Sequence, residues 1–538
     1  MVEQIQNVEV KRQRSSSWLR WLVIGLLVVG VVFRLYQPGH KVYWFDETMT
    51  SLRIAGYTQE TLVAAVVNQP PITAEDFLER YQYPDHQRTR AAALAALKTH
   101  PEHSPLYYVM AWGWLYPAGH SVGNLRLLSA LFGLATIPAA YWLGRELFQA
   151  AEAGWAIAAI VAISPFHVLY SQEAREYSLW TLAIVLSSAV LLRARRRNTV
   201  PAWSLYGVTL ALGLYSHVFY GFVVMSHGLY MILAERWRPT RRLLAYGGAV
   251  LLGLALFAPW LMVMLDNWDR LLGNTVGMTL DRQGFLPLFW LLNLSRLFFD
   301  LNQGPSAINP AHYLLLALCA YALWYLYQHA PRATSLFVLT LIGVTAIALM
   351  GSDLLLGGRR STITRYPVPC YVGLQVAVGY LLWRMLQDPH QSRRTYQRWR
   401  AGAIALALSG VLSIVVNAHH ALWWNKSYAV SRFNPAAAEI INQSDRPLMI
   451  TDRDPSEVLA FVHRLEANVQ VQLIARPNAP DQPPDLRPIV PDIPPAAYSD
   501  VFLYQPSQGL RLRMERQGMP SSDVNGGGWL WTVSIPSP

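Results

Sequence analysis

Two adjacent carboxylates follow the first apolar segment of the chain. Asp46 and Glu47 stand in the stretch KVYWFDETMTSLRIAG, residues 41–56, directly after three aromatic residues. Ionisable side chains at the edge of a membrane are costly to desolvate and therefore often mark function. A partly desolvated carboxylate is also a stronger base, suited to taking a proton from a hydroxyl group. The alternative is structural, because either carboxylate could cap a helix.

Further ionisable and aromatic residues occur in four short segments elsewhere in the chain. These segments are HSPLYY (103–108), SQEAREYS (171–178), YSHVFY (215–220) and GGRRSTITRYP (357–367). Each has a structural alternative: a helix start for the first, a simple ion pair for the second, and headgroup contacts for the paired arginines of the last. The candidate binding residues that they contain are His103, Glu173, Arg175, Tyr177, His217, Arg365 and Tyr366.

Metal binding has weaker support. His86, His100 and His103 could supply ligands, but their spacing matches no established pattern. Cys319 and Cys370 both lie in apolar segments, which indicates neither a disulfide framework nor a zinc site. The sequence specifies no cofactor, and it leaves a divalent metal open as the alternative.

The composition indicates which elements must position these residues. The chain has 538 residues, of which 53% are hydrophobic and 14% charged, against about 25% charged in typical soluble domains. Its apolar runs match the length needed to cross a bilayer. The formal charge of +11 comes from Lys and Arg in short loops between these runs, which is the pattern of membrane topology and not of nucleic-acid binding. We expect a polytopic α-helical membrane protein.

Eleven membrane spans are predicted, with a contentious segment at 104–118. If that segment does not cross, the basic loops near 193–197, 236–242 and 393–400 all share the cytoplasmic side with the N-terminus, as the positive-inside rule requires. We therefore expect 104–118 to lie along the outer interface. The predicted spans are 18–36, 125–143, 153–169, 178–193, 202–216, 219–234, 243–264, 311–328, 333–350, 367–386 and 401–422.

Three outer features accompany these spans. The first outer loop, 37–124, should contain helices near 57–67, 74–81 and 87–98, and the loop 265–310 should contain an interfacial amphipathic helix. The tail alternates strand-like runs (RPLMITD, VQVQLIA, DVFLYQ, GWLWTVSI) with a helical pattern at 455–467. We predict a membrane-embedded domain, 1–424, and a small outward-facing α/β domain, 425–538. The protein should reside in the inner or plasma membrane.

The ordered series of motifs resembles GT-C type membrane glycosyltransferases. The motifs are WFDETMTSLRIA after the first span, HSPLYYVMAW, NLRLLSALFGLATIPAAYWLGRELF and SPFHVLYSQEAREYSLWTL. They are similar to those of bacterial protein O-mannosyltransferases and lipid A aminoarabinose transferases, mainly over residues 18–235. The family commonly has His-Pro-Pro where this chain has His103-Ser104-Pro105.

The resemblance implies a GT-C-like fold and transfer of a sugar from a polyprenyl-phosphate donor on the outer membrane face. The acceptor would be a lipid, glycan or protein, and membrane lipids would surround the site. On this basis Asp46 is the expected general base, and Glu47 the residue that orients the acceptor or the loop. Arg175 and Arg365 suit the donor phosphate because a guanidinium donates two bonds while it stays charged. His217 and Tyr366 are supporting donors.

Two other functions fit parts of the sequence. A transporter or flippase could use the same outer cavity, but it should carry charged or broken helices near the bilayer midplane, whereas the ionisable residues here crowd the predicted outer ends. The other alternative is an inactive scaffold or sensor that displays the tail.

Overall fold

The computed structural model describes residues 2–84, 90–275, 285–423, 428–476, 493–494, 497–524 and 526–535. By contacts between residues the chain forms two units. The helical unit comprises Met1–Pro38, His100–Tyr107 and Gly123–His420. The sheet unit comprises Gly39–Thr99, Tyr108–Val122 and Ala421–Pro538. The predicted division at residue 424 stays a prediction.

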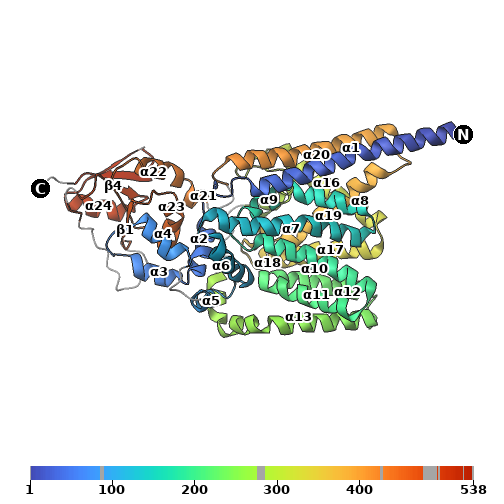
Figure 1. The fold of residues 1–538 in the computed structure, drawn as a ribbon, viewed down its shortest axis with the longest axis horizontal. Coiled ribbons are helices and arrows are strands. Elements are labelled where there is room, and N and C mark those ends of the chain that lie inside the picture. The colour runs from blue at the N-terminus through green and yellow to red at the C-terminus, as the bar shows by residue number, and fades with distance from the viewer. Residues whose placement is uncertain are drawn as a thin grey trace. The chain divides into compact units, whose positions relative to one another are not determined.

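Long helices that run side by side make up the helical unit (Figure 1). A π-helical turn, Ile347–Gly351, joins α17 to α18, and a 3₁₀ turn, Arg360–Thr362, precedes α19. The α-helices are α1 (Val2–Leu35), α7 (Val122–Phe148), α8 (Ala151–Ala162), α9 (Pro165–Ser171), α10 (Tyr177–Arg197), α11 (Val200–Ser216), α12 (Tyr220–Ala234), α13 (Arg241–Asp266), α14 (Trp268–Thr275), α15 (Leu286–Ser295), α16 (Pro310–His329), α17 (Arg332–Ala346), α18 (Ser352–Leu355), α19 (Val368–Gln387) and α20 (Arg393–His419).

Seven helical segments of the described chain are long and apolar enough to cross a membrane, or eight if one bent pair counts as a single span. This makes the chain an integral membrane protein, but the eleven predicted spans are not confirmed. Helices α11 and α12 occupy predicted spans with only 17 and 15 residues. The seven segments are Ser17–Leu35, Val122–Phe148, Tyr177–Arg197, Arg241–Asp266, Pro310–His329, Arg332–Leu355 and Arg393–His419.

The predicted span 153–169 falls on two helices, because the chain bends by 62° between α8 and α9. Pro165 begins α9; proline has no N–H to continue a helix and disfavours helical geometry at the residue before it. The break leaves the last carbonyl groups of α8 without helical partners. Arg34 of α1 donates to two of them, with Nη1 2.6 Å from the oxygen of Ala162 and Nη2 3.0 Å from that of Val161.

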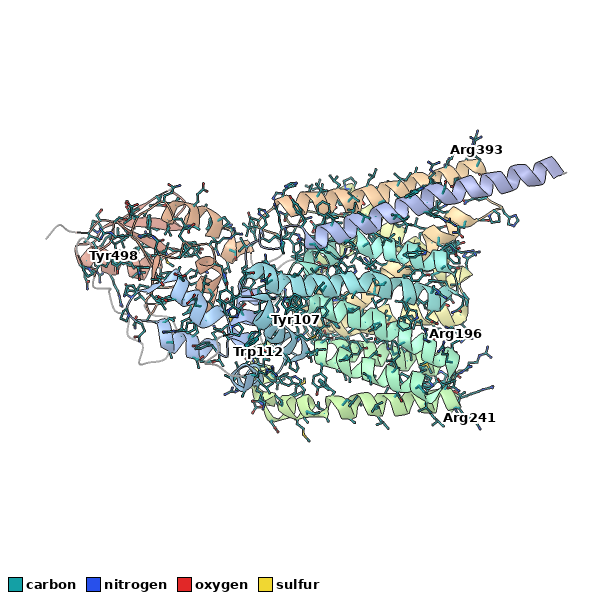
Figure 2. All side chains as sticks on the ribbon, in the orientation of Figure 1. Tyr107, Trp112, Arg196, Arg241, Arg393 and Tyr498 are labelled. Carbon is teal, nitrogen blue, oxygen red and sulfur yellow. The ribbon has the colours of Figure 1, made fainter. Side chains whose placement is uncertain are left out.

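Basic residues gather at one end of the helical unit. Figure 2 shows Arg196, Arg241 and Arg393 at that end, on three different helices. This agrees with the expectation that the basic loops share one side of the membrane, as the positive-inside rule requires. Which side of the membrane they face, and the side on which each terminus lies, stay predictions.

Short helices occupy the two segments that we expected to lie at an interface. Helix α6, Leu106–Ala118, has 13 residues and contains Pro117, too short to span a bilayer, which takes about 20 residues. In the loop 265–310, α14 and α15 have 8 and 10 residues. These short lengths agree with the predicted topology, while the position of these helices relative to a membrane stays a prediction.

The sheet unit contains a six-stranded sheet in the order β1-β3-β2-β4-β6-β5. Strands β3, β2 and β4 are parallel, and the remaining pairings are antiparallel. The strands are β1 (Ile72–Thr73), β2 (Pro447–Thr451), β3 (Gln470–Leu473), β4 (Asp500–Tyr504), β5 (Ser521–Asp523) and β6 (Leu530–Val533). The helices are α2 (Phe45–Ile54), α3 (Gln59–Val66), α4 (Ala74–Gln82), α5 (Arg90–Lys98), α21 (Tyr428–Ser431), α22 (Asn434–Ile441), α23 (Pro455–Val462) and α24 (Gln508–Arg516).

Successive residues of the central strands belong to two different apolar clusters, because side chains along a strand point alternately to its two faces. Met449 and Phe502 join one cluster, which helices α2, α3, α4, α22 and α23 cover. Leu448 and Leu503 join the other, which α24 covers. All four strand-like runs of the tail contain a strand, but the first loop adds β1, which pairs with β3 at Ile72 and Val471.

Candidate functional site

Four connections between helices supply the candidate site of the helical unit. Residues 172–176 join α9 to α10, residues 217–219 join α11 to α12, residues 363–367 precede α19, and residues 100–105 precede α6. Each connection leaves helix-terminal N–H and C=O groups that side chains can bind. These are the segments that the sequence singled out for polar chemistry.

His103, Arg175 and Glu176 form the centre of this site. Nη2 of Arg175 lies 3.1 Å from Oε1 of Glu176 and 3.5 Å from Nδ1 of His103. The same His103 nitrogen lies 3.6 Å from Oε1 of Glu176. Arg175 and Glu176 are each 2% exposed, so this ion pair is shielded from water and from screening by salt.

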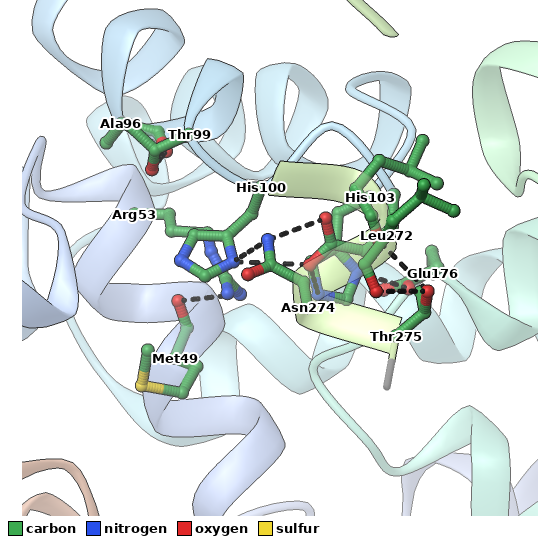
Figure 3. A network of polar contacts seen from close by, with 12 residues as sticks. Met49, Arg53, Ala96, Thr99, His100, His103, Glu176, Leu272, Asn274 and Thr275 are labelled. Atoms are coloured by element: carbon green, nitrogen blue, oxygen red, sulfur yellow. Dashed lines mark hydrogen bonds and ion pairs between the residues drawn. The ribbon is translucent and has the colours of Figure 1, made fainter. Parts of the chain in front are cut away.

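A second carboxylate extends the network on the other side of His103. Oε1 of Glu102 lies 3.9 Å from Nε2 of His103 and 3.2 Å from Nδ1 of His100. Asn274, at the end of α14, donates to Oε2 of Glu102 at 3.1 Å, and its amide nitrogen lies 3.2 Å from Nδ1 of His100 (Figure 3). His103 therefore stands between two carboxylates.

The environment keeps both carboxylates ionised. Burial by itself raises the pKa of Glu102, but hydrogen bonds from His100 and Asn274 and the charge of His103 outweigh it and lower the pKa to about 2. Burial acts the same way on Glu176, and the charges of Arg175 and His103 hold its pKa well below the ordinary value. Opposite charges at short range favour the charged form of each group.

Aromatic rings connect Arg175 with Arg365. The guanidinium carbon of Arg175 lies 5.6 Å from the ring centre of Tyr177, and that of Arg365 lies 5.5 Å from the same ring. Arg365 is also 5.7 Å from the ring centre of Tyr366. Cation–π attraction operates within about 6 Å of a ring centre, so Tyr177 holds two cations from distant parts of the chain near each other.

His217 is a neutral member of the site. Its ring stacks on Trp180 with centres 4.0 Å apart, and its Nδ1 accepts the N–H of Phe219 at 3.1 Å. Burial lowers the pKa of His217 to about 3, although Glu176 opposes this effect. A neutral ring that accepts at Nδ1 carries its proton on Nε2, which makes Nε2–H a donor at neutral pH.

A buried polar scaffold positions the segment that carries Arg365. Asp353, fully buried, accepts from the backbone N–H of Ser361 at 2.6 Å and from its hydroxyl at 2.7 Å. Asn293 of α15 donates to the oxygen of Thr362 at 3.0 Å and accepts from the hydroxyl of Thr364 at 2.8 Å. The segment leading to Arg365 is thus tied to α18 and α15.

Asp46 and Glu47 belong to the sheet unit, in the first turn of α2. Glu47 is 1% exposed, and its Oε2 accepts the backbone N–H of Trp44, the cap residue, at 3.4 Å. This is the reciprocal side-chain contact of a capping box. The carbonyl of Asp46 accepts the hydroxyl of Thr50. The roles of both carboxylates in chemistry stay predictions.

The structure brings six predicted residues into one network: His103, Arg175, Tyr177, His217, Arg365 and Tyr366. Glu173 is nearby in the chain and 2% exposed, and its carbonyl accepts the N–H of Arg175. The roles of all these residues stay predictions.

Sequence reasoning missed Glu102, Glu176 and Asn274. Glu176 stands in the same short connection as Arg175, but the sequence does not show whether Glu173 or Glu176 forms the ion pair with that arginine. Asn274 had no readable signal, since its place depends on how α14 packs. Within the described ranges, no three or more His, Cys, Asp or Glu side chains come together to hold a metal ion, and His86 lies outside those ranges.

Comparisons with known proteins converge on one fold. Residues 100–263 match the family model described as dolichyl-phosphate-mannose-protein mannosyltransferase. Crystal structures of ArnT from Cupriavidus metallidurans, bound to undecaprenyl phosphate and in the apo state, match with TM-scores of 0.53 and 0.57. Sequence identities are 16% and 15%, and each match covers 97% of this chain and 100% of the other. A comparison with curated protein sequences finds no match.

Proposed function

From the fold of GT-C type membrane glycosyltransferases, which this chain shares, we infer that it moves a sugar from a polyprenyl-phosphate-linked donor to a lipid, glycan or protein acceptor on the outer face of the membrane. One observation carries this proposal. The segment that matches the mannosyltransferase family, 100–263, is the segment that supplies His103, Arg175, Glu176 and His217 to the buried cluster.

The cluster has the chemistry that such a donor requires. Arg175 and Arg365 are permanently charged and can each donate two bonds to a phosphate. Tyr177 keeps the two guanidinium groups within reach of one ring. The Nε2–H of neutral His217 adds a donor without adding charge. Binding at this cluster would stabilise the charge that develops on the departing phosphate.

The reaction requires one bond exchange and one proton transfer. The acceptor hydroxyl oxygen bonds to the anomeric carbon of the sugar, and the bond between that carbon and the phosphate oxygen breaks. Polyprenyl phosphate leaves with the bonding electrons. The hydroxyl proton passes to a carboxylate base, for which Asp46 is the candidate.

The test compares Asp46→Asn with Arg365→Ala in purified protein reconstituted into nanodiscs. Asp46→Asn cannot take a proton, so single-turnover transfer should fall by about 10²–10⁴ while donor binding persists. Arg365→Ala removes a charge that holds the phosphate before and during departure, so donor affinity and turnover should both fall. Loss of donor binding in Asp46→Asn alone, with Arg365→Ala unchanged, would reverse the two assignments.

The same purified protein reconstituted into sealed liposomes, whose two leaflets face separate compartments, distinguishes transfer from transport. Release of polyprenyl phosphate and glycosylation of an added acceptor indicate transfer. Movement of intact donor between leaflets, with no released phosphate, would indicate the flippase alternative instead.

A further inference from the structure

The sheet of the sheet unit contains a point where its connections diverge. After β2 the chain passes through α23 to β3 on one side, whereas after β4 it passes through α24 to β5 and β6 on the other. Strands β2 and β4 are parallel neighbours, so their carboxyl ends meet at one edge. In open α/β sheets, ligands bind at this edge, where the strand order reverses.

Polar residues occupy both strand ends at this edge. Asp452 and Arg453 follow β2, and Gln505 and Ser507 follow β4. Oδ1 of Asp452 accepts the N–H of Ser507 at 2.9 Å, and Nη1 of Arg453 donates to the amide oxygen of Gln505 at 2.7 Å. Gln505 has a φ of 42°, a left-handed conformation that is uncommon and strained for a residue other than glycine.

Two buried groups at this edge have hydrogen-bonding capacity left over. Asp452 is 3% exposed, and its Oδ2 has no partner among the described residues. Asn434 is 1% exposed, and its Nδ2 likewise has none within the described part of the chain. The hydroxyl of Tyr504, at the end of β4, donates to Oδ1 of Asn434 at 2.5 Å. Buried polar atoms are nearly always satisfied, so such exceptions call for a partner.

The charge at this edge restricts what that partner can be. Asp452, Asp454 and Glu457 outnumber Arg453, and Arg453 already donates from Nε to Glu457 at 2.8 Å. A phosphate would meet net negative charge, although two helix N-termini lie here. A metal is equally unsupported, because no suitable cluster occurs among the described residues. A neutral ligand rich in hydroxyl groups fits, since a hydroxyl can donate to a carboxylate and accept from an amide.

An aromatic pair adjoins the polar groups. Phe433, next to Asn434, stacks on Trp529 with ring centres 5.4 Å apart and planes 9° apart. The carbonyl of Trp529 accepts the N–H of Gln505, which ties this pair to the end of β4. Aromatic faces offer apolar contact beside polar groups, and the C–H face of a sugar ring needs both.

We propose that the carboxyl edge of β2 and β4 is a binding site for a neutral sugar, with Asp452 and Asn434 as its hydrogen-bonding residues and Phe433 and Trp529 as its apolar wall. The binding itself is independent of catalysis. Its use, to hold the glycan part of an acceptor, rests on the proposed function.

The experiment measures sugar binding to the full-length protein in nanodiscs, without donor. Glucose, galactose, mannose, arabinose and N-acetylglucosamine serve as probes in saturation-transfer NMR and calorimetry, and inorganic phosphate is tested alongside them. At least one sugar should bind saturably. Asp452→Asn keeps the acceptor for Ser507 but loses the charge, so it should weaken that binding by about tenfold or more.

A matched control is Asp500→Asn, an exposed carboxylate at the opposite end of β4. It should bind sugar like the unchanged protein. Asn434→Leu provides a second variant at the site, and thermal unfolding checks that each variant folds. The proposal fails if no sugar binds, if phosphate binds in preference, or if folded Asp452→Asn and Asn434→Leu both bind normally.

Transfer to a small acceptor that lacks a sugar separates this proposal from the catalytic one. Asp452→Asn should leave that transfer unchanged. If the protein without substitutions binds sugar but transfers none, the proposed function is wrong and the proposal of a sugar-binding site still stands.

Discussion

Arg34 and Arg175 are both buried in the helical unit, 0% and 2% exposed, yet they have different kinds of partners. Arg34 donates to backbone carbonyls of Gly30, Val161 and Ala162. Arg175 contacts the ionisable side chains of Glu176 and His103. The first arginine completes a broken helix, and the second belongs to a cluster whose charges come from three connections.

The kind of partner decides whether the contacts of each arginine can change when a ligand binds. A carbonyl has a fixed partial charge and cannot titrate, so the surroundings of Arg34 stay the same whatever binds. Glu176 and Glu102 carry full charges, and a bound anion would redistribute the interactions of this cluster with Arg175. Burial of an arginine therefore does not by itself indicate a binding site; the kind of partner does.

The largest effect should follow from replacing Arg34. Arg34→Leu removes the donors to Val161 and Ala162 at the α8–α9 break, and each buried carbonyl left unsatisfied costs about 1–3 kcal/mol. We expect a strongly lowered unfolding temperature and little protein in membranes. Arg20→Leu, an exposed arginine of the same helix, is the control. If Arg34→Leu has normal stability but no transfer, Arg34 takes part in the reaction, and its structural role does not distinguish it from Arg175.

The next effect should come from removing the charges of the Arg175 pair together. The double variant Arg175→Gln/Glu176→Gln removes both charges of the pair instead of leaving one of them without the other, so it should fold, while transfer falls by about 10²–10³ as for the loss of a transition-state donor. Arg195→Gln/Glu235→Gln removes another ion pair, also at 3.1 Å, and should transfer normally. Equal losses in both double variants would deny the Arg175 pair a special role.

A smaller effect should appear in the pH dependence of stability. The pKa of His217 is about 3 in the folded chain, because burial lowers it from 6.5. Between these values the unfolded chain binds more protons, so stability falls as pH falls from 6.5 toward 3, by up to about 1.4 kcal/mol per pH unit. His217→Asn should flatten this slope in thermal unfolding curves. An unchanged slope would assign it to other groups.

The smallest effect should come from Asn274, at the margin of the cluster. Asn274→Ala removes its bond to Glu102, worth about 0.5–1.5 kcal/mol, and should reduce transfer only a few-fold. Asn267→Ala is the matched control, because Asn267 donates only locally, to the oxygen of Val263. A loss as large as that of the Arg175 double variant would show that Asn274 contributes to transfer as strongly as the Arg175–Glu176 pair does.

Sequence patterns predicted the parts of the cluster that depend on local order. Arg175 and His217 stand in short connections between apolar runs, and that position is readable from hydropathy alone. Which carboxylate of SQEAREYS meets Arg175 was not readable, because side-chain directions in an irregular connection depend on packing against other segments. Pro165 is itself a local signal for the break before it, but the apolar residues on both sides of it together have the length of one membrane span. Strand β1, with two residues, has no local signal, since only its pairing with β3 defines it.

That pairing has a consequence for the time order of folding. Residues of β1 are synthesised early and those of β3 late, so the strand must wait while the ribosome adds the intervening apolar helices, roughly 20–80 s at ordinary elongation rates. Closing so long a loop is also entropically unfavourable until the tail supplies its contacts. The sheet is therefore the last part of the chain to be completed, and a truncated product would expose the apolar residues of α2, α3 and α4 to chaperones and proteases.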